Sequence, residues 1–139
     1  MHNTPNLSHL EAQTVITAIQ AELERRGKAA VIAVADAHGE LLAVLRVSGA
    51  ALPCIGIAQN KAFTAARERR ASFEIGQASR HATDGFDLRN FGDSRYIGWG
   101  GGLPVWAEGA CVGAVGVSGL AEGEDIELAQ LGIDALELR

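Results

Sequence analysis

The chain has 139 residues, which suits a single domain over 1–139, and 47% of them are hydrophobic, enough to form a buried core. Acidic residues outnumber basic ones by 17 to 12, which argues against nucleic acid as a partner because phosphate binding relies on lysine and arginine. No apolar run is long enough to span a bilayer and the first residues do not form a secretory signal, so we expect a cytoplasmic protein with no membrane partner.

The first predicted element is a helix over about residues 8–26. Ser8 and Glu11 have the spacing of a capping box, in which each side chain accepts a hydrogen bond from the other residue's backbone N–H. Apolar residues then recur at helical spacing, and Gly27 suits the left-handed conformation that often ends a helix.

A hairpin and two helices are predicted next. Residues 29–35 are apolar throughout, as in a central strand that is covered on both faces, and 40–47 form the second strand after a turn. Pro53 suits the first turn of a second helix, and a short helical piece follows at 71–77.

The second half of the chain begins with an irregular segment, 80–95, that mixes acids, arginines and phenylalanines. Residues 96–99 suggest a short strand, and a second hairpin and a helix from near Glu122 follow. The order of elements predicts an α/β fold of the α+β kind. We expect a mostly antiparallel sheet of about five strands, profilin- or PAS-like, flanked by helices with the two terminal helices on one side.

Four segments, taken in order, resemble the GlcG/HbpS family, which also occurs as the C-terminal domain of some PduO-type proteins. They are VIAVADAHGELLAVLRVSGA (31–50), GIAQNKAFTAAR (56–67), GWGGGLPV (98–105) and VGAVGVSGLAEGEDIELAQLGI (112–133). The resemblance implies a compact subunit that forms homo-oligomers. It also implies haem or cobalamin binding in several members, whereas others have unknown roles beside catabolic genes. A shared fold does not imply one shared reaction.

Two glycine-rich stretches invite different interpretations. Gly113–Gly119 precedes a helix whose first turn is acidic, so close packing of helix on sheet is favoured over a phosphate loop. Gly100, Gly101 and Gly102 could instead turn their backbone donors toward a ligand, or simply form a tight turn; both interpretations stay open.

The residues that suit a ligand site are cationic and aromatic. Guanidinium groups beside aromatic rings suit a planar ligand with a carboxylate, through paired hydrogen bonds and stacking. Contacts between subunits, held by arginine–aspartate pairs, would explain the same residues. The predicted set is Arg89, Arg95, Tyr96 and Trp99 with the three glycines, joined by Lys61 from the second helix and Arg46 from the end of the second strand.

Candidates for metal chemistry are few. His81, beside the irregular segment, is the most plausible histidine to ligate a haem iron. No pair of histidines or cysteines has the spacing of a metal site, so no structural metal is expected, and Cys54 and Cys111 are interpreted as free thiols. No activated nucleophile is evident, and catalytic residues stay unknown.

The sequence therefore favours an oligomeric binding protein for haem, a corrinoid or another planar carboxylated ligand. A homo-oligomer larger than a dimer is expected because the long aromatic loop needs burial. The alternative is a small isomerase or hydrolase of aromatic or organic-acid catabolism. Its acid–base groups would be Lys61, Asp36, His81 or Tyr96. A third hypothesis is a scaffold whose loop serves only assembly.

Overall fold

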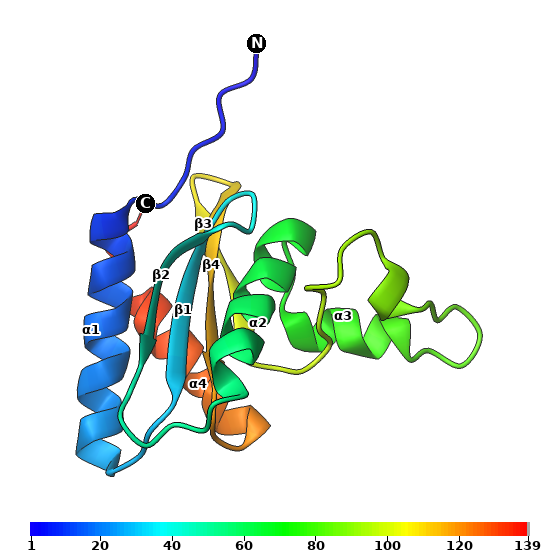
Figure 1. The fold of residues 1–139 in the computed structure, drawn as a ribbon. Coiled ribbons are helices and arrows are strands. Elements are labelled where there is room, and N and C mark those ends of the chain that lie inside the picture. Colours follow the sequence, from blue (N-terminus) through cyan, green and yellow to red (C-terminus); the bar gives the residue numbers. More distant parts are fainter. Residues whose placement is uncertain (139) are drawn as a thin grey trace.

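The fold is a four-stranded antiparallel sheet with helices on both faces (Figure 1), described for residues 1–138 by a computed structural model. The strands lie side by side in the order β2–β1–β4–β3, and every pair is antiparallel. Their bounds are Val31–Asp36 (β1), Leu41–Arg46 (β2), Gly102–Ala107 (β3) and Ala110–Ser118 (β4).

The helices divide between the two faces of the sheet. Ile32 and Val34 of β1 pack with α1 (His9–Arg26) and α4 (Glu122–Asp134), whereas Val31 and Ala33 pack on α2 (Cys54–Glu68). Because successive residues of a strand face opposite sides, the terminal helices share one face and α2 covers the other, which confirms that prediction. The short helices α3 (Ser72–Ser79) and η1 (Leu88–Asn90) belong to residues 72–98, which extend beyond α2 (Figure 1) and are called the arm below.

Small residues let α2 approach the sheet closely. A Cβ atom at Gly116 of β4 would lie 2.1 Å from the carbonyl oxygen of Ala58, so only glycine fits there. Glycines of β4 thus serve packing, as the sequence indicates.

The ends of α1 match the expected capping pattern. Ser8 N donates to Glu11 Oε1 at 2.6 Å and Glu11 N donates to Ser8 Oγ at 3.4 Å, while Gly27 has a φ of 66°. The hydrogen bonds from the Ser8 backbone and hydroxyl lower the pKa of Glu11. The capping box and the glycine C-cap are confirmed.

The expected fifth strand is wrong for residues 96–99. The backbone donors here do not bond to a neighbouring strand. Ile97 N donates to Thr64 Oγ1 at 3.0 Å and Tyr96 N to the Asp93 carbonyl, and Gly100 N, just after the segment, donates to Glu122 Oε2 at 2.9 Å. The segment therefore runs irregularly from the arm to β3, and the likeness to profilin or PAS domains stays a prediction.

Candidate functional site

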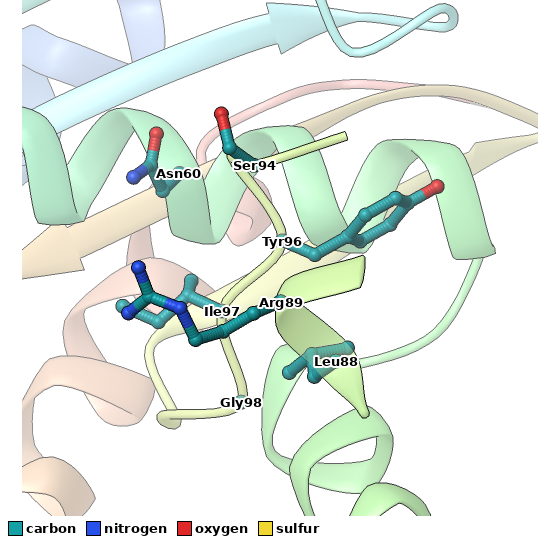
Figure 2. Close-up of a pocket in the computed structure, with 7 residues that line it drawn as sticks. All are labelled: Asn60, Leu88, Arg89, Ser94, Tyr96, Ile97 and Gly98. Carbon is teal, nitrogen blue, oxygen red and sulfur yellow. The ribbon is translucent and has the colours of Figure 1, made fainter. Parts of the chain in front are cut away.

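A pocket of about 350 Å³ lies between α2 and the chain from η1 to Gly98 (Figure 2), a volume within the range of small-ligand sites. One wall comes from the middle of α2 and the other from the arm. The lining residues are Asn60, Leu88, Arg89, Ser94, Tyr96, Ile97 and Gly98.

Two close contacts hold Ile97 and Gly98 against α2 and α3. Thr64, fully buried in α2, accepts the hydrogen bond from Ile97 N. On α3, a Cβ atom at Gly76 would lie 1.9 Å from the carbonyl oxygen of Gly98, so the two backbones touch. The pocket wall is thus positioned by α2 and α3 together.

Arg89 supplies the pocket's positive charge. Among residues 1–138 no carboxylate lies within ion-pair distance of its guanidinium, and its backbone N–H donates to Asp87 Oδ1 at 3.1 Å, which orders the turn. Figure 2 shows the guanidinium on the same side of the pocket as Asn60. The planar fork of an arginine suits a carboxylate through two parallel hydrogen bonds.

Tyr96 lines the pocket, but its ring points away from the Arg89 guanidinium (Figure 2). The hydroxyl donates to Glu68 Oε2 at 3.1 Å, and the ring meets Phe63 edge-to-face with centroids 5.1 Å apart. Burial, reinforced by the hydrogen bond to Glu68, raises the pKa of Tyr96. The phenol therefore stays neutral and suits ring contacts better than proton abstraction.

Arg95 is committed to the protein's own carboxylates. It pairs with Asp93 at 3.0 Å and Glu40 at 3.3 Å, and its guanidinium lies 4.0 Å over the Phe63 ring. The hydrogen bonds from Arg95 lower the pKa of Asp93 to about 2. Arg95 thus holds the loop to the body, and it does not line the pocket.

The structure places the predicted site residues Lys61 and Arg46 away from the pocket. Lys61 is only 3% exposed, and its Nζ donates to Asp125 Oδ2 at 3.1 Å and to the Val117 carbonyl at 2.9 Å. Desolvation by burial raises the pKa of Asp125, although the Lys61 charge opposes the shift. Arg46 is exposed at the end of β2, an edge strand separated from β3 by two others.

The three consecutive glycines serve packing and not ligand binding. Gly100 N bonds to Glu122, Gly102 N donates to Ser72 Oγ at 2.9 Å, and the Gly101 carbonyl accepts from Val117 N at 3.0 Å. The backbone donors of Gly100 and Gly102 are thus already used within the chain. A Cβ atom at Gly101 would lie 2.8 Å from Lys61 Nζ, which leaves no room for another residue.

His81 and Trp99 lie outside the pocket. The exposed His81 accepts hydrogen bonds at Nδ1 from Thr83 N (3.2 Å) and Asp84 N (3.0 Å), so a neutral imidazole carries its proton on Nε2 and presents no lone pair outward. Trp99 is 56% exposed, and its carbonyl accepts from Ser72 Oγ at 2.6 Å.

Neither a cluster of metal-binding side chains nor a helix suited to span a membrane occurs among residues 1–138. These residues contain no group of three or more histidine, cysteine or acidic side chains placed to hold a metal ion. None of their helices is both long and apolar enough to cross a membrane.

Sequence reasoning missed most of the pocket. Only Arg89 and Tyr96 of the predicted set line it together. The lining residues that the sequence did not indicate are apolar or small polar, and they belong to no local motif. The sequence likewise gave no sign that Asp125, one of several acids in the first turn of α4, pairs with Lys61. Only the three-dimensional arrangement identifies Leu88, Ser94, Ile97 and Gly98 as lining residues.

The family of the chain follows from comparison with known proteins. The family model described as haem degrading protein HbpS-like matches residues 7–134. The chain belongs to the HbpS-like family. It is 35% identical over 119 residues to protein GlcG of Escherichia coli K12, a match that covers 81% of each chain.

A second relative of this HbpS-like protein is much longer. The corrinoid adenosyltransferase PduO of Citrobacter freundii is 28% identical over 134 residues, which are 96% of this chain but only 40% of PduO. The chain therefore spans less than half of that protein.

Two solved structures share the fold of this HbpS-like protein. A crystal structure of a PduOC:heme complex has a TM-score of 0.88 with 25% identity and covers 96% of this chain and 97% of its own. HbpS of Streptomyces reticuli, as a double mutant, has a TM-score of 0.86 with 28% identity and covers 98% of this chain and 90% of its own. Both likenesses support the family.

Proposed function

We propose that this HbpS-like protein binds a small planar ligand that carries a carboxylate, in the pocket between α2 and the arm. The observation that carries the proposal is the Arg89 guanidinium, which faces no carboxylate of residues 1–138, while Arg89 lines a cavity of about 350 Å³. Asn60 and Ser94 add neutral hydrogen-bonding groups at the same cavity. The pocket thus offers one cation, two polar side chains and the apolar side chains of Leu88 and Ile97.

Haem is the first ligand to test, because one solved relative is a heme complex and the family model is named for haem degradation. The pocket fits one part of that molecule only. Arg89 can pair with a haem carboxylate, and Leu88 and Ile97 can pack on the ring. No histidine or cysteine lines the pocket, and the Tyr96 hydroxyl is bonded to Glu68, so these residues supply no axial ligand to the iron. A corrinoid is the second candidate, since PduO is a corrinoid adenosyltransferase.

The alternative of an acid–base enzyme receives no support from the geometry. Lys61 is buried in its ion pair, and Asp36 accepts hydrogen bonds from His38 N at 2.9 Å and Glu40 N at 3.0 Å within the β1–β2 turn. Neither of them lines the pocket that holds Tyr96, and nor does His81. We therefore propose binding and not catalysis.

Titration with haemin tests the proposed function. The native protein should give a saturable shift of the Soret band, and Arg89→Ala should weaken binding about ten- to a hundredfold because a charge-assisted hydrogen bond is lost. Arg25→Ala is the matched control, since Arg25 pairs with Glu22 on the exposed side of α1. Equal affinity of the Arg89 variant and the control would refute the proposed pocket.

His81→Ala tests the axial ligand that the sequence suggests. We expect its Soret band to match that of the native protein, because the Nδ1 atom already accepts two backbone hydrogen bonds. A band that moves toward that of free haemin in this variant would instead establish His81 as the iron ligand.

A further inference from the structure

A second cavity, of about 370 Å³, is lined by both hairpin turns and the N-terminal segment. These segments lie at the same end of the sheet (Figure 1). It shares no lining residue with the pocket beside Arg89. Its walls come from residues 3–5, the β1–β2 turn, the end of α2 and the β3–β4 hairpin, and no acidic residue lines it. Its positive charge comes from Arg69, with His38 nearby on the same lining.

Arg69 differs from the neighbouring arginines at the end of α2. Arg67 pairs with Glu40 at 3.6 Å and donates to the His38 carbonyl, and Arg70 pairs with Glu74 at 3.2 Å. No carboxylate of residues 1–138 lies within ion-pair distance of Arg69, which lines the cavity instead. Of Arg67, Arg69 and Arg70, it is therefore Arg69 that can pair with an anion from outside the chain.

The backbone at Arg69 is strained. Its φ of 53° and ψ of 38° place it in the left-handed region, at the C-cap of α2, where its N–H donates to the Ala65 carbonyl. A residue with a side chain is disfavoured there by contact of its Cβ atom with the backbone, whereas glycine adopts the conformation freely. The chain thus carries an arginine at a position where the fold alone favours glycine.

Trp106 provides the aromatic surface of the cavity. It lies in β3 and is 50% exposed, an unusual state for so large an apolar ring on a strand. The register of β3 and β4 shifts between Val105 and Trp106, so that Trp106 stands opposite Cys111. Such a bulge re-aims the side chains that follow it and is frequent next to binding sites.

Cys111 lines the same cavity as a neutral thiol. Desolvation by burial raises its pKa, an effect that its backbone hydrogen bond and the nearby charge of Arg69 only partly oppose. The thiol is therefore a half-buried, weakly polar wall of the cavity and not a nucleophile.

We propose that this cavity is a second ligand site, which binds a small aromatic carboxylate through Arg69 and Trp106. The guanidinium pairs with the carboxylate while the indole packs against the ring. The cavity volume lies within the range of small-ligand sites, and no carboxylate of the lining repels the ligand. This site is independent of the pocket proposed for haem.

Benzoate is the probe. Acetate, which has the carboxylate but no ring, and benzyl alcohol, which has the ring but no charge, are the control ligands. Calorimetric titration of the native protein should show saturable, millimolar or tighter binding of benzoate and much weaker binding of the other two. In a ¹H–¹⁵N spectrum, benzoate should shift the indole signal of Trp106 and leave that of Trp99, the only other tryptophan of the chain, in place. Trp106→Phe assigns the two signals.

Arg69→Gly separates binding from folding. Because glycine relieves the strained backbone, this variant should unfold at the same temperature or higher, yet bind benzoate about tenfold or more weakly. Arg70→Ala removes the same charge from an arginine that pairs with Glu74 and should bind normally. Absence of saturable benzoate binding, a shift confined to Trp99, or equal affinities of the Arg69 and Arg70 variants would each overturn the proposal. Arg89→Ala should leave this titration unchanged, so failure here and failure of the haem pocket are distinguishable.

Discussion

The buried pair of Lys61 and Asp125 is the residue-scale feature with the largest expected energetic effect. Lys61 comes from α2 and Asp125 from α4, on opposite faces of the sheet, and both side chains are 4% exposed. Asp125 Oδ1 also accepts from Leu120 N at 3.1 Å, so the carboxylate joins the start of α4 to the end of β4. Such a pair fixes geometry more than it adds net stability, because desolvation offsets the attraction.

Removing one partner of the pair should therefore lower the free energy of unfolding much more than removing both charges. Lys61→Met should lower the free energy of unfolding by about 3–5 kcal/mol, because it leaves a buried carboxylate without its cation. Lys61→Met combined with Asp125→Asn should recover most of the loss, since asparagine keeps an oxygen acceptor for Leu120 N. Urea unfolding measures both, with exposed Lys28→Ala as the control. Equal losses in the single and double variants would contradict the prediction.

Asp93 gives a pH dependence with a defined sign. Its pKa falls to about 2 in the folded protein, mainly through hydrogen bonds from Arg95, against a usual value of 3.8. A carboxyl group with a lowered folded pKa stabilises the fold above its unfolded pKa, and this contribution is lost as pH falls from about 4 to about 2. Asp93→Asn should flatten the decline of melting temperature in that window, and added salt should shrink the difference because the pair is exposed. Parallel melting curves for both proteins across the window would exclude this role.

At the scale of elements, two parts of the arm touch through a backbone contact that only glycine allows. The contact of Gly76 with Gly98 joins α3 to the segment that lines the Arg89 pocket. Gly123, in the first turn of α4, has open space around its Cβ position. The two helical glycines therefore make a matched pair.

Gly76→Ala should destabilise the protein and weaken ligand binding at the Arg89 pocket, because a Cβ atom there would overlap the Gly98 carbonyl. Gly123→Ala should leave binding unchanged and stabilise the fold by about 0.5–1 kcal/mol, since alanine reduces the entropy of the unfolded chain. Thermal unfolding and haemin titration of both variants check the prediction. A Gly76 variant with native affinity would show that the contact does not position the pocket.

At the scale of the whole molecule, the arm exposes aromatic rings. Phe86 and Phe91 are 36% and 41% exposed and lie 4.8 Å apart between ring centroids, and Phe91 in turn packs on Tyr96. Exposed aromatic clusters on small domains are typical of interfaces. We propose that the arm joins copies of this chain in the homo-oligomer.

Light scattering after size-exclusion chromatography should give an assembly larger than a dimer at micromolar concentration. Phe86→Ser should reduce that size without altering the circular dichroism spectrum, because this ring contacts Phe91 and solvent and not the core. Leu10→Ser, which changes an exposed leucine on α1, is the control and should keep the native size. A monomeric native protein would overturn the assembly.

The sequence by itself determined the elements whose signals are local. The capping box at Ser8, the C-cap at Gly27 and the two hairpins depend on residues a few positions apart, so their patterns predict structure directly. The uninterrupted apolar run of β1 likewise predicted cover on both faces of the sheet, which α2 and the terminal helices provide.

Only the tertiary structure decided which charges are available. Lys61 meets Asp125 across 64 positions of the chain and Arg95 meets Glu40 across 55, whereas Arg89 and Arg69 face cavities. Residues 96–99 have the composition of a strand, but Ile97 N bonds to a side chain of α2, and the following Gly100 N bonds to one of α4. The sequence gives the position of each arginine and glycine. The long-range packing around a residue determines whether its polar groups bond to the rest of the chain or stay available to a ligand.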